Sequence, residues 1–188
     1  VWDAETGGAL LVIDVGSEVL ALMVFTDPAT GAPRLACGAS KRRSGDVRVF
    51  DPIAGGEALL VLDIGFDVNA LAFFTDPATG TPRLACGSES DKMVRVFNPV
   101  AGGRALLVID AGSEVLALAV FIDPAKGDLR LACGCTDKKV RIFDSVAGGE
   151  ALVVLEGGGS SMVIFKDPAT SGLRLASESG GKMFVFDL

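Results

Sequence analysis

Short apolar runs recur along the chain, separated by clusters of Gly, Pro, Asp, Ser and Thr. In one stretch the runs cover Ala58–Asp63, Val68–Phe74, Arg83–Gly87 and Val94–Asn98. Short runs bounded by turn residues predict β-strands, and the turn residues interrupt each run before a stable helix could form. The nearly continuous apolar run at Val68–Phe74 indicates a strand that is covered on both faces.

The same order of runs occurs four times. Arg-Leu-Ala begins at residues 34, 83, 130 and 174, and Asp-Pro-Ala begins at residues 27, 76, 123 and 167. Both motifs recur at steps of 49, 47 and 44 residues, which indicates an array of similar supersecondary units. A four-stranded sheet repeated at this interval predicts an all-β propeller, in which residues 1–188 form a single domain of four repeats.

The second copy has Leu84-Ala85-Cys86-Gly87-Ser88, then Asp91, then Val94-Arg95-Val96-Phe97-Asn98, and the third copy follows the same order. These residues resemble those of the WD-repeat propeller family, whose repeat typically reads Leu-Ala-Ser-Gly-Ser, a turn with Asp, and Val-Arg-Val-Trp-Asp. Val1-Trp2-Asp3 matches the end of such a repeat. The resemblance covers the whole chain and implies four-stranded antiparallel blades.

The sequence departs from the family in its polar residues. The family commonly has a His that joins the turn Asp, a strand Ser or Thr and the Trp in a buried network, but this chain has no His. Phe replaces the Trp at Phe50, Phe97, Phe143 and Phe186. Because all partners of the network are lost together, no half-satisfied polar group is left, and we expect looser turns at Asp91 and Asp137.

The resemblance also implies that each blade takes its outer strand from the chain that follows its third strand. The first blade would then comprise Val19–Phe25, Arg34–Gly38, Val47–Asp51 and Ala58–Asp63. The fourth blade lacks an outer strand, whereas Ala9–Asp14 is an outer-strand sequence left over at the other end. The candidate closure strand consists of Leu10, Leu11, Val12 and Ile13.

Three arrangements remain open for this strand. It closes the fourth blade of its own chain in a four-bladed monomer, two chains exchange it in an eight-bladed ring, or the chain is a piece of a longer array. Small residues (Ala, Gly and Cys) on the second strands suit a close approach of neighbouring sheets. They favour the eight-bladed homodimer, so another copy of the chain is an expected partner.

Charge and hydropathy exclude several classes of partner. The net charge of −7 argues against nucleic acid, which requires a concentrated basic face. Ala9–Phe25 is the best candidate for a membrane span, but Asp14 and Glu18 interrupt it, so we expect no membrane insertion. No signal peptide is visible after Val1, and we expect a reducing, cytoplasmic location.

Candidate catalytic and metal chemistry finds no support in the sequence. No His is available as a general base, and neither Ser nor Cys lies in a nucleophile motif. Cys37, Cys86 and Cys133 recur at one repeat position, where thiols of successive blades would be too far apart for disulfides. Cys133-x-Cys135 lacks the spacing of a zinc site. We therefore expect buried core thiols, no catalytic site, no cofactor and no metal.

A recurring arginine is expected to brace the hairpin of each repeat against the aspartate of its Asp-Pro turn. The expected pairs are Arg34 with Asp27, Arg83 with Asp76, Arg130 with Asp123, and Arg174 with Asp167.

Two sets of charged turns are expected on one face near the central channel, as the resemblance implies. The acidic set, which precedes the innermost strands, comprises Asp14, Glu18, Asp63, Asp67, Asp110 and Glu114. The basic set, which follows the second strands, comprises Lys41, Arg42, Arg43, Lys92, Lys138, Lys139 and Lys182. Phe66 stands where two sister turns have Ser. The two sets either compensate each other or form a recognition surface for a charged protein segment.

The leading hypothesis is therefore a non-enzymatic scaffold for protein–protein interaction, with an unidentified protein partner. A structural unit that assembles with itself through strand exchange is the alternative. A propeller that binds sugar or another small ligand is disfavoured, because the chain has no Tyr and a single Trp.

Overall fold

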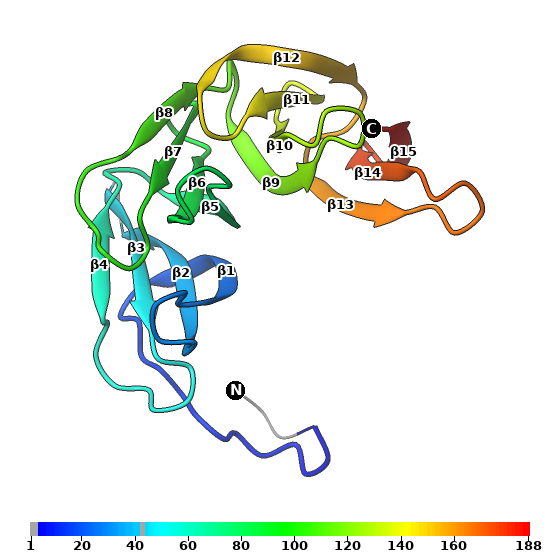
Figure 1. The fold of residues 1–188 in the computed structure, drawn as a ribbon. Coiled ribbons are helices and arrows are strands. Elements are labelled where there is room, and N and C mark those ends of the chain that lie inside the picture. Colours follow the sequence, from blue (N-terminus) through cyan, green and yellow to red (C-terminus); the bar gives the residue numbers. More distant parts are fainter. Residues whose placement is uncertain (1–3, 42–43) are drawn as a thin grey trace.

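The protein forms an open arc of four antiparallel sheets (Figure 1). The structure is a computed structural model that describes residues 4–41 and 44–188. The predicted strand end at Val1-Trp2-Asp3 and the two basic residues Arg42 and Arg43 lie outside the described residues.

The strands follow one another along the chain within each sheet, so each sheet is a meander. Blade 1 comprises β1 (Glu18–Thr26), β2 (Pro33–Lys41), β3 (Ser44–Phe50) and β4 (Leu60–Asp63). Blade 2 comprises β5 (Val68–Thr75), β6 (Pro82–Ser88), β7 (Met93–Phe97) and β8 (Leu107–Asp110). Blade 3 comprises β9 (Val115–Ile122), β10 (Leu129–Cys135), β11 (Lys139–Asp144) and β12 (Gly148–Glu156). Blade 4 comprises β13 (Ser161–Lys166), β14 (Leu173–Ser179) and β15 (Lys182–Asp187). These blades confirm the predicted all-β architecture, and within the described residues blade 4 has three strands.

The hairpin between the first two strands of each blade follows from its Asp-Pro-Ala sequence. In blade 2 the N–H of Asp76 donates to the carbonyl of Thr81 (2.9 Å), and the N–H of Gly80 donates to the carbonyl of Asp76 (2.9 Å). Oδ1 of Asp76 accepts the N–H of Ala78 (2.9 Å), and Gly80 has the positive φ of 69° that the turn needs. Local turn chemistry therefore defines this hairpin.

The predicted arginine braces are confirmed in all four repeats. The nitrogen-to-oxygen distances are 3.4 Å for Arg34–Asp27, 2.9 Å for Arg83–Asp76, 3.7 Å for Arg130–Asp123 and 2.9 Å for Arg174–Asp167. Asp27 and Asp76 are buried, so at these two positions the pair neutralises a carboxylate that has little access to water.

The brace at Asp76 should make the stability of the protein depend on pH. The hydrogen bond from Arg83 and that from the Ala78 N–H hold the pKa of Asp76 below 3.8 in the folded state. Stabilisation from this group is therefore present above the unfolded pKa of about 3.9 and is lost as the pH falls through the lower folded value. We expect Asp76→Asn to have a lower free energy of unfolding than the natural chain at neutral pH. This difference in unfolding free energy should become smaller in acid.

Urea unfolding at neutral and acidic pH measures this difference in unfolding free energy, and Glu57→Gln at an exposed position is the matched control. An equal difference in unfolding free energy at both pH values would contradict a role for the ionised carboxylate.

The apolar core lies between neighbouring blades and encloses the middle of each third strand. Between blades 1 and 2, Val47 and Val49 of β3 pack with Leu71, Leu84 and Cys86. Blades 2 and 3 enclose the equivalent residues of β7, and blades 3 and 4 enclose those of β11. Each blade is therefore stabilised by contact with its neighbours rather than by a core of its own.

The four cysteines are buried and unpaired, which confirms the expectation of core thiols. Desolvation raises the pKa of Cys135 to about 11 and raises the pKa values of Cys37, Cys86 and Cys133 as well. Protonated, buried thiols are poor nucleophiles and poor metal ligands. These residues therefore act as small apolar groups in the core.

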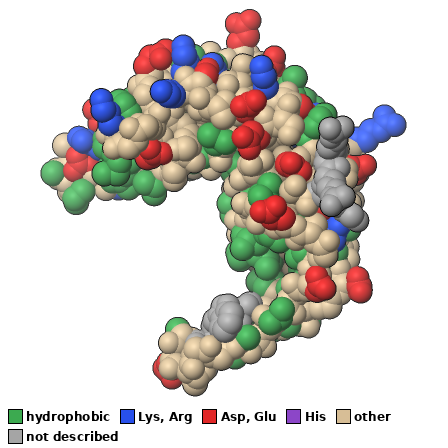
Figure 2. Space-filling view, turned by 180° about the vertical axis from the view of Figure 1, so that it is seen from behind, with side chains coloured by type: hydrophobic (Ala, Val, Ile, Leu, Met, Phe, Trp, Pro, Cys, Tyr) green, Lys and Arg blue, Asp and Glu red, His purple; other side chains and the backbone are tan. Residues whose placement is uncertain are grey.

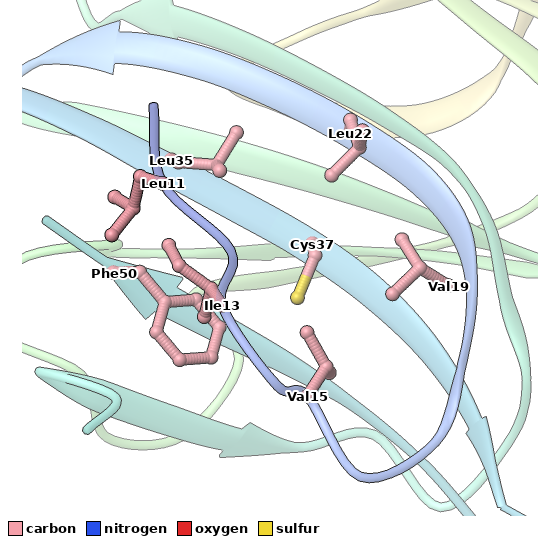
Figure 3. Close-up of a pocket in the computed structure, with 8 residues that line it drawn as sticks. All are labelled: Leu11, Ile13, Val15, Val19, Leu22, Leu35, Cys37 and Phe50. Carbon is pink, nitrogen blue, oxygen red and sulfur yellow. The ribbon is translucent and has the colours of Figure 1, made fainter. Parts of the chain in front are cut away.

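The segment before β1 lies along blade 1 and belongs to no strand between residues 10 and 15. A cavity of about 250 Å³ separates it from the blade (Figure 3). The lining residues are Leu11, Ile13 and Val15 of the segment and Val19, Leu22, Leu35, Cys37 and Phe50 of blade 1. At the end of the segment, Nη1 of Arg48 donates to the carbonyl of Val15 (2.5 Å). No described strand pairs with the outer edge of β15, so closure by Leu10–Ile13 stays a prediction.

Candidate partner-binding face

The structure brings the acidic and basic turns to one edge of the blades. The N–H of Ala111 donates to the carbonyl of Lys92 (2.9 Å), and the N–H of Gly157 donates to the carbonyl of Lys138 (2.9 Å). The N–H of Thr136 donates to the carbonyl of Glu114 (3.0 Å). The first two bonds tie the turn that leaves an outer strand to the turn that follows the second strand of the same blade, and the third ties the turn that enters blade 3 to the turn after its second strand. We refer to this edge as the turn face.

Three of the predicted acidic residues shape their own turns. In each case Oδ1 accepts the N–H of the Gly two residues later, and that Gly has a positive φ. The pairs are Asp14 with Gly16 (2.8 Å), Asp63 with Gly65 (3.1 Å) and Asp110 with Gly112 (2.8 Å). The three aspartates are exposed, so one carboxylate oxygen supports the turn and the other remains available to a partner.

The other three acidic residues begin the inner strands or lie directly before them. Glu18 is exposed at the start of β1, and Asp67 is half-buried before β5. Oε2 of Glu114 accepts a hydrogen bond from Oγ1 of Thr136 (3.0 Å). The acidic set is thus repeated from blade to blade along the turn face.

Phe66 is exposed in the turn between β4 and β5, where it contacts a guanidinium group. Cζ of Arg95 lies 5.6 Å from the centroid of the Phe66 ring, within the range of a cation–π interaction. Nη2 of Arg95 also lies 2.5 Å from Oδ2 of Asp91. The ring is therefore held in place by a cation that is itself paired with an anion.

Sequence reasoning missed the structural role of this arginine, although the repeated Val-Arg-Val motif marks its position. The equivalent Arg48 pairs with Asp46 (2.8 Å), and Arg141 pairs with Asp137 (2.5 Å). The pair lowers the pKa of the Asp137 carboxyl. Arginine pairs therefore hold both aspartates, whereas the expectation of looser turns at Asp91 and Asp137 stays a prediction.

Blade 4 lacks this arrangement. Phe184 occupies the position of the arginine, and its ring lies against Gly157 in the turn from β12 to β13. That turn is Gly-rich and carries no carboxylate between Gly157 and Ser161. The repeated pair of acidic residues therefore belongs to the turns before blades 1 to 3, whereas the turn before blade 4 has only Glu156, which is paired with Lys139.

The predicted basic residues divide into paired and unpaired cations. Nζ of Lys139 lies 2.9 Å from Oε1 of Glu156, which is a compensating pair. Lys92 and Lys138 are exposed with left-handed φ values of 63° and 65°, and neither forms an ion pair with another described residue. Their ammonium groups, like the exposed carboxylates, remain available to a partner.

Comparison with solved structures gives the context of this architecture. BBS1N in complex with ARL6DN matches with a TM-score of 0.67 at 14% identity, over 94% of this chain and 54% of that one. Polycomb repressive complex 2 of Chaetomium thermophilum bound to GSK126 contains a chain that matches with a TM-score of 0.66 at 17% identity, over 95% of this chain and 41% of that one. The chain has the fold of the WD40 propellers.

The similarity extends over part of each matched chain. The chain spans about half the length of BBS1N, or less in the other case, so it corresponds to part of such a propeller. A scan of protein-family models found no match, and no curated protein matched the sequence. The comparisons therefore establish the fold alone.

Residues 4–41 and 44–188 contain no group of three or more Cys, Asp or Glu side chains placed to hold a metal ion. In the same part of the chain no helix is long and apolar enough to cross a membrane.

Proposed function

We propose that the protein is a non-enzymatic interaction scaffold of the WD40 type, and that its turn face binds a basic segment of a protein partner. The observation that carries the proposal is the recurrence of exposed carboxylates at one edge of three successive blades. A cationic peptide running along that edge would meet Glu18, Asp63 and Asp110 in turn.

The electrostatic balance of the chain supports a basic partner. The net charge is −7, so the field of the whole protein attracts cations and repels other acidic surfaces. Phe66 adds an exposed aromatic ring at the same edge, and aromatic residues are enriched among those that dominate binding energy. The proposed contact thus combines electrostatic attraction with one apolar anchor.

Substitutions at Glu18 and Phe66 test the proposal without removing a turn-forming carboxylate. We expect the double variant Glu18→Gln with Phe66→Ala to weaken binding of a Lys- and Arg-rich peptide about tenfold or more, because it removes a charge and the aromatic anchor. Fluorescence anisotropy at low and high salt measures the affinity, which should fall as salt screens the charges.

The matched control is Glu5→Gln with Ile53→Ala, which changes one carboxylate and one apolar residue away from the turn face. Equal affinity of both double variants, or binding of an acidic peptide as tight as that of the basic one, would contradict the proposal.

A further inference from the structure

The outer strands β4, β8 and β12 lie on the convex side of the arc, and each carries exposed apolar side chains (Figure 1). In the space-filling view, hydrophobic side chains lie among acidic and basic ones along this side (Figure 2). In blade 2, Leu106 is 51% exposed and Val108 is 52% exposed. Blades 1 and 3 both pack against blade 2 within the described chain, so this exposure arises in the middle of the arc.

The segment from residue 104 to residue 110, which includes β8, alternates between the two faces of blade 2. Leu107 and Ile109 belong to the core between blades 2 and 3. The opposite face carries the exposed members, which are Arg104, Leu106, Val108 and Asp110. The run Ala-Leu-Leu-Val-Ile is continuously apolar, as in strands that are covered on both faces, but the described chain covers one face of it.

Strand β8 is also the edge of its sheet. It pairs with β7 on one side, from Met93 opposite Asp110 to Val96 opposite Leu107. No described strand pairs with its other side. An apolar edge strand is a template for pairing with another chain, and charged side chains along it determine which strand fits.

We infer that β8 pairs antiparallel with β8 of a second copy of this chain, about a twofold axis at Leu107. In this register Arg104 lies opposite the partner's Asp110, and Leu106 lies opposite the partner's Val108. The twofold axis repeats each pair, because the same surface is used by both copies. The uncovered face then gains two apolar pairs flanked by two ion pairs of opposite charge.

The two charged residues of this contact are available within a single copy. The ion pairs of blade 2 join Arg83 with Asp76 and Arg95 with Asp91, so Arg104 is in no ion pair with another described residue. Oδ1 of Asp110 accepts the N–H of Gly112, which leaves Oδ2 for a cation.

The three residues before β8 can join the proposed ladder. The N–H of Leu106 donates to the carbonyl of Val96 (2.7 Å), so contact with β7 begins before Leu107. In blade 3 the equivalent of Arg104 is Glu150, which lies inside the longer strand β12. The repeat position of Arg104 is therefore compatible with an extended strand.

The other outer strands carry charges that oppose such self-pairing. Arg104 departs from the repeat, since Glu57 of blade 1 and Glu150 of blade 3 stand at its position. In the same register Glu57 would lie opposite Asp63 of a second β4. Glu150 would lie opposite Glu156 of a second β12. Like charges directly opposite each other destabilise a strand pair, so neither outer strand suits its own copy.

A mixed pair of outer strands is opposed for the same reason. If β8 paired with β4 or β12 of a second copy, Arg104 would meet a carboxylate. Asp110, however, would then lie opposite Glu57 or Glu150. Pairing of β8 with β8 is thus the arrangement of these three strands in which both ends of the contact have opposite charges.

This contact is separate from the predicted closure of the ring and from the proposed binding of a basic peptide. The double variant Glu18→Gln with Phe66→Ala lies outside β8, so it should weaken binding of the peptide and leave self-association unchanged. The failure of one proposal is therefore distinguishable from the failure of the other.

The mass of the 188-residue chain in solution is the first test. Light scattering at rising concentration should approach twice the 19.3 kDa of one chain. Arg104→Glu places like charges at both ends of the contact and should weaken association about tenfold or more. Because Arg104 is exposed within one copy, the far-ultraviolet spectrum of this variant should match that of the natural chain.

Lys126→Glu is the matched control for this test, since it makes the same change of charge at an exposed residue of a hairpin turn. We expect it to associate as tightly as the natural chain. A natural chain that stays monomeric at all concentrations would overturn the inference. Association of Arg104→Glu that equals that of Lys126→Glu would overturn it as well.

A disulfide between two differently tagged copies tests the register. Leu106→Cys in one copy and Val108→Cys in the other should cross-link on mild oxidation, because directly opposite residues have the Cα separation that a disulfide needs. The four natural cysteines are buried and should not interfere. Leu59→Cys with Val61→Cys is the control, since these residues have the same repeat positions in blade 1 and similar exposure. Equal cross-linking of both pairs, or of neither pair, would overturn the proposed register.

Discussion

Gly38→Ala should destabilise the folded protein by about 3 kcal/mol, at the upper end of the range for overpacking. A Cβ on Gly38 would lie 2.6 Å from the carbonyl oxygen of Val68 and 2.8 Å from its Cγ1. Neither atom can move easily, because Val68 is fully buried at the start of β5 and its side chain is β-branched. The substitution therefore forces blades 1 and 2 apart, and urea unfolding followed by circular dichroism measures the loss.

Gly8→Ala is the control for this prediction. Gly8 has no positive φ, and a Cβ there would meet only Oγ1 of Thr6 at 3.4 Å, which is an ordinary contact. We expect the Gly8→Ala variant to have the same free energy of unfolding as the natural chain. If Gly38→Ala were equally stable, the close approach of the two blades would not require glycine at this position.

The architecture could be predicted because its determinants are local and occur four times. Each hairpin contains an Asp-Pro turn closed by hydrogen bonds between residues a few positions apart, as at Asp27, whose N–H donates to Ala32. Each second strand has small residues where the next blade approaches, and the contacts of Gly38 confirm that expectation. Repetition turns weak local signals into a consistent pattern.

The turn face was predicted only in part. The acidic and basic turns lie side by side because of the order of strands in a blade. The backbone hydrogen bonds to the carbonyls of Lys92 and Lys138 show this adjacency. The contact between Arg95 and Phe66 was not foreseen, because it joins the third strand of blade 2 to the turn that enters that blade. Such contacts depend on how neighbouring sheets are placed, which local sequence does not encode.

The position of the segment around Leu11 illustrates the same limit. Its sequence resembles that of an outer strand, but residues 10–15 belong to no strand. Among its described contacts, Leu11, Ile13 and Val15 line the cavity beside blade 1, and the carbonyl of Val15 accepts a hydrogen bond from Arg48. Pattern predicts the kind of element, whereas the identity of the partner depends on the whole assembly.

Leu84→Ala is the second substitution for which we expect a large effect. Leu84 of β6 is fully buried in the core between blades 1 and 2. Loss of its transfer free energy and the cavity left behind should cost about 2–5 kcal/mol of unfolding free energy. Thermal and urea unfolding measure the cost, and Leu59→Ala at an exposed position is expected to change stability little.

Leu35→Ala removes the same side chain from the equivalent position of blade 1, where it lines the cavity. Leu35 is half-buried in the described chain, so this substitution should cost less unfolding free energy than Leu84→Ala. Urea unfolding of both variants measures the difference. Equal losses in the two variants would contradict the weaker packing of Leu35.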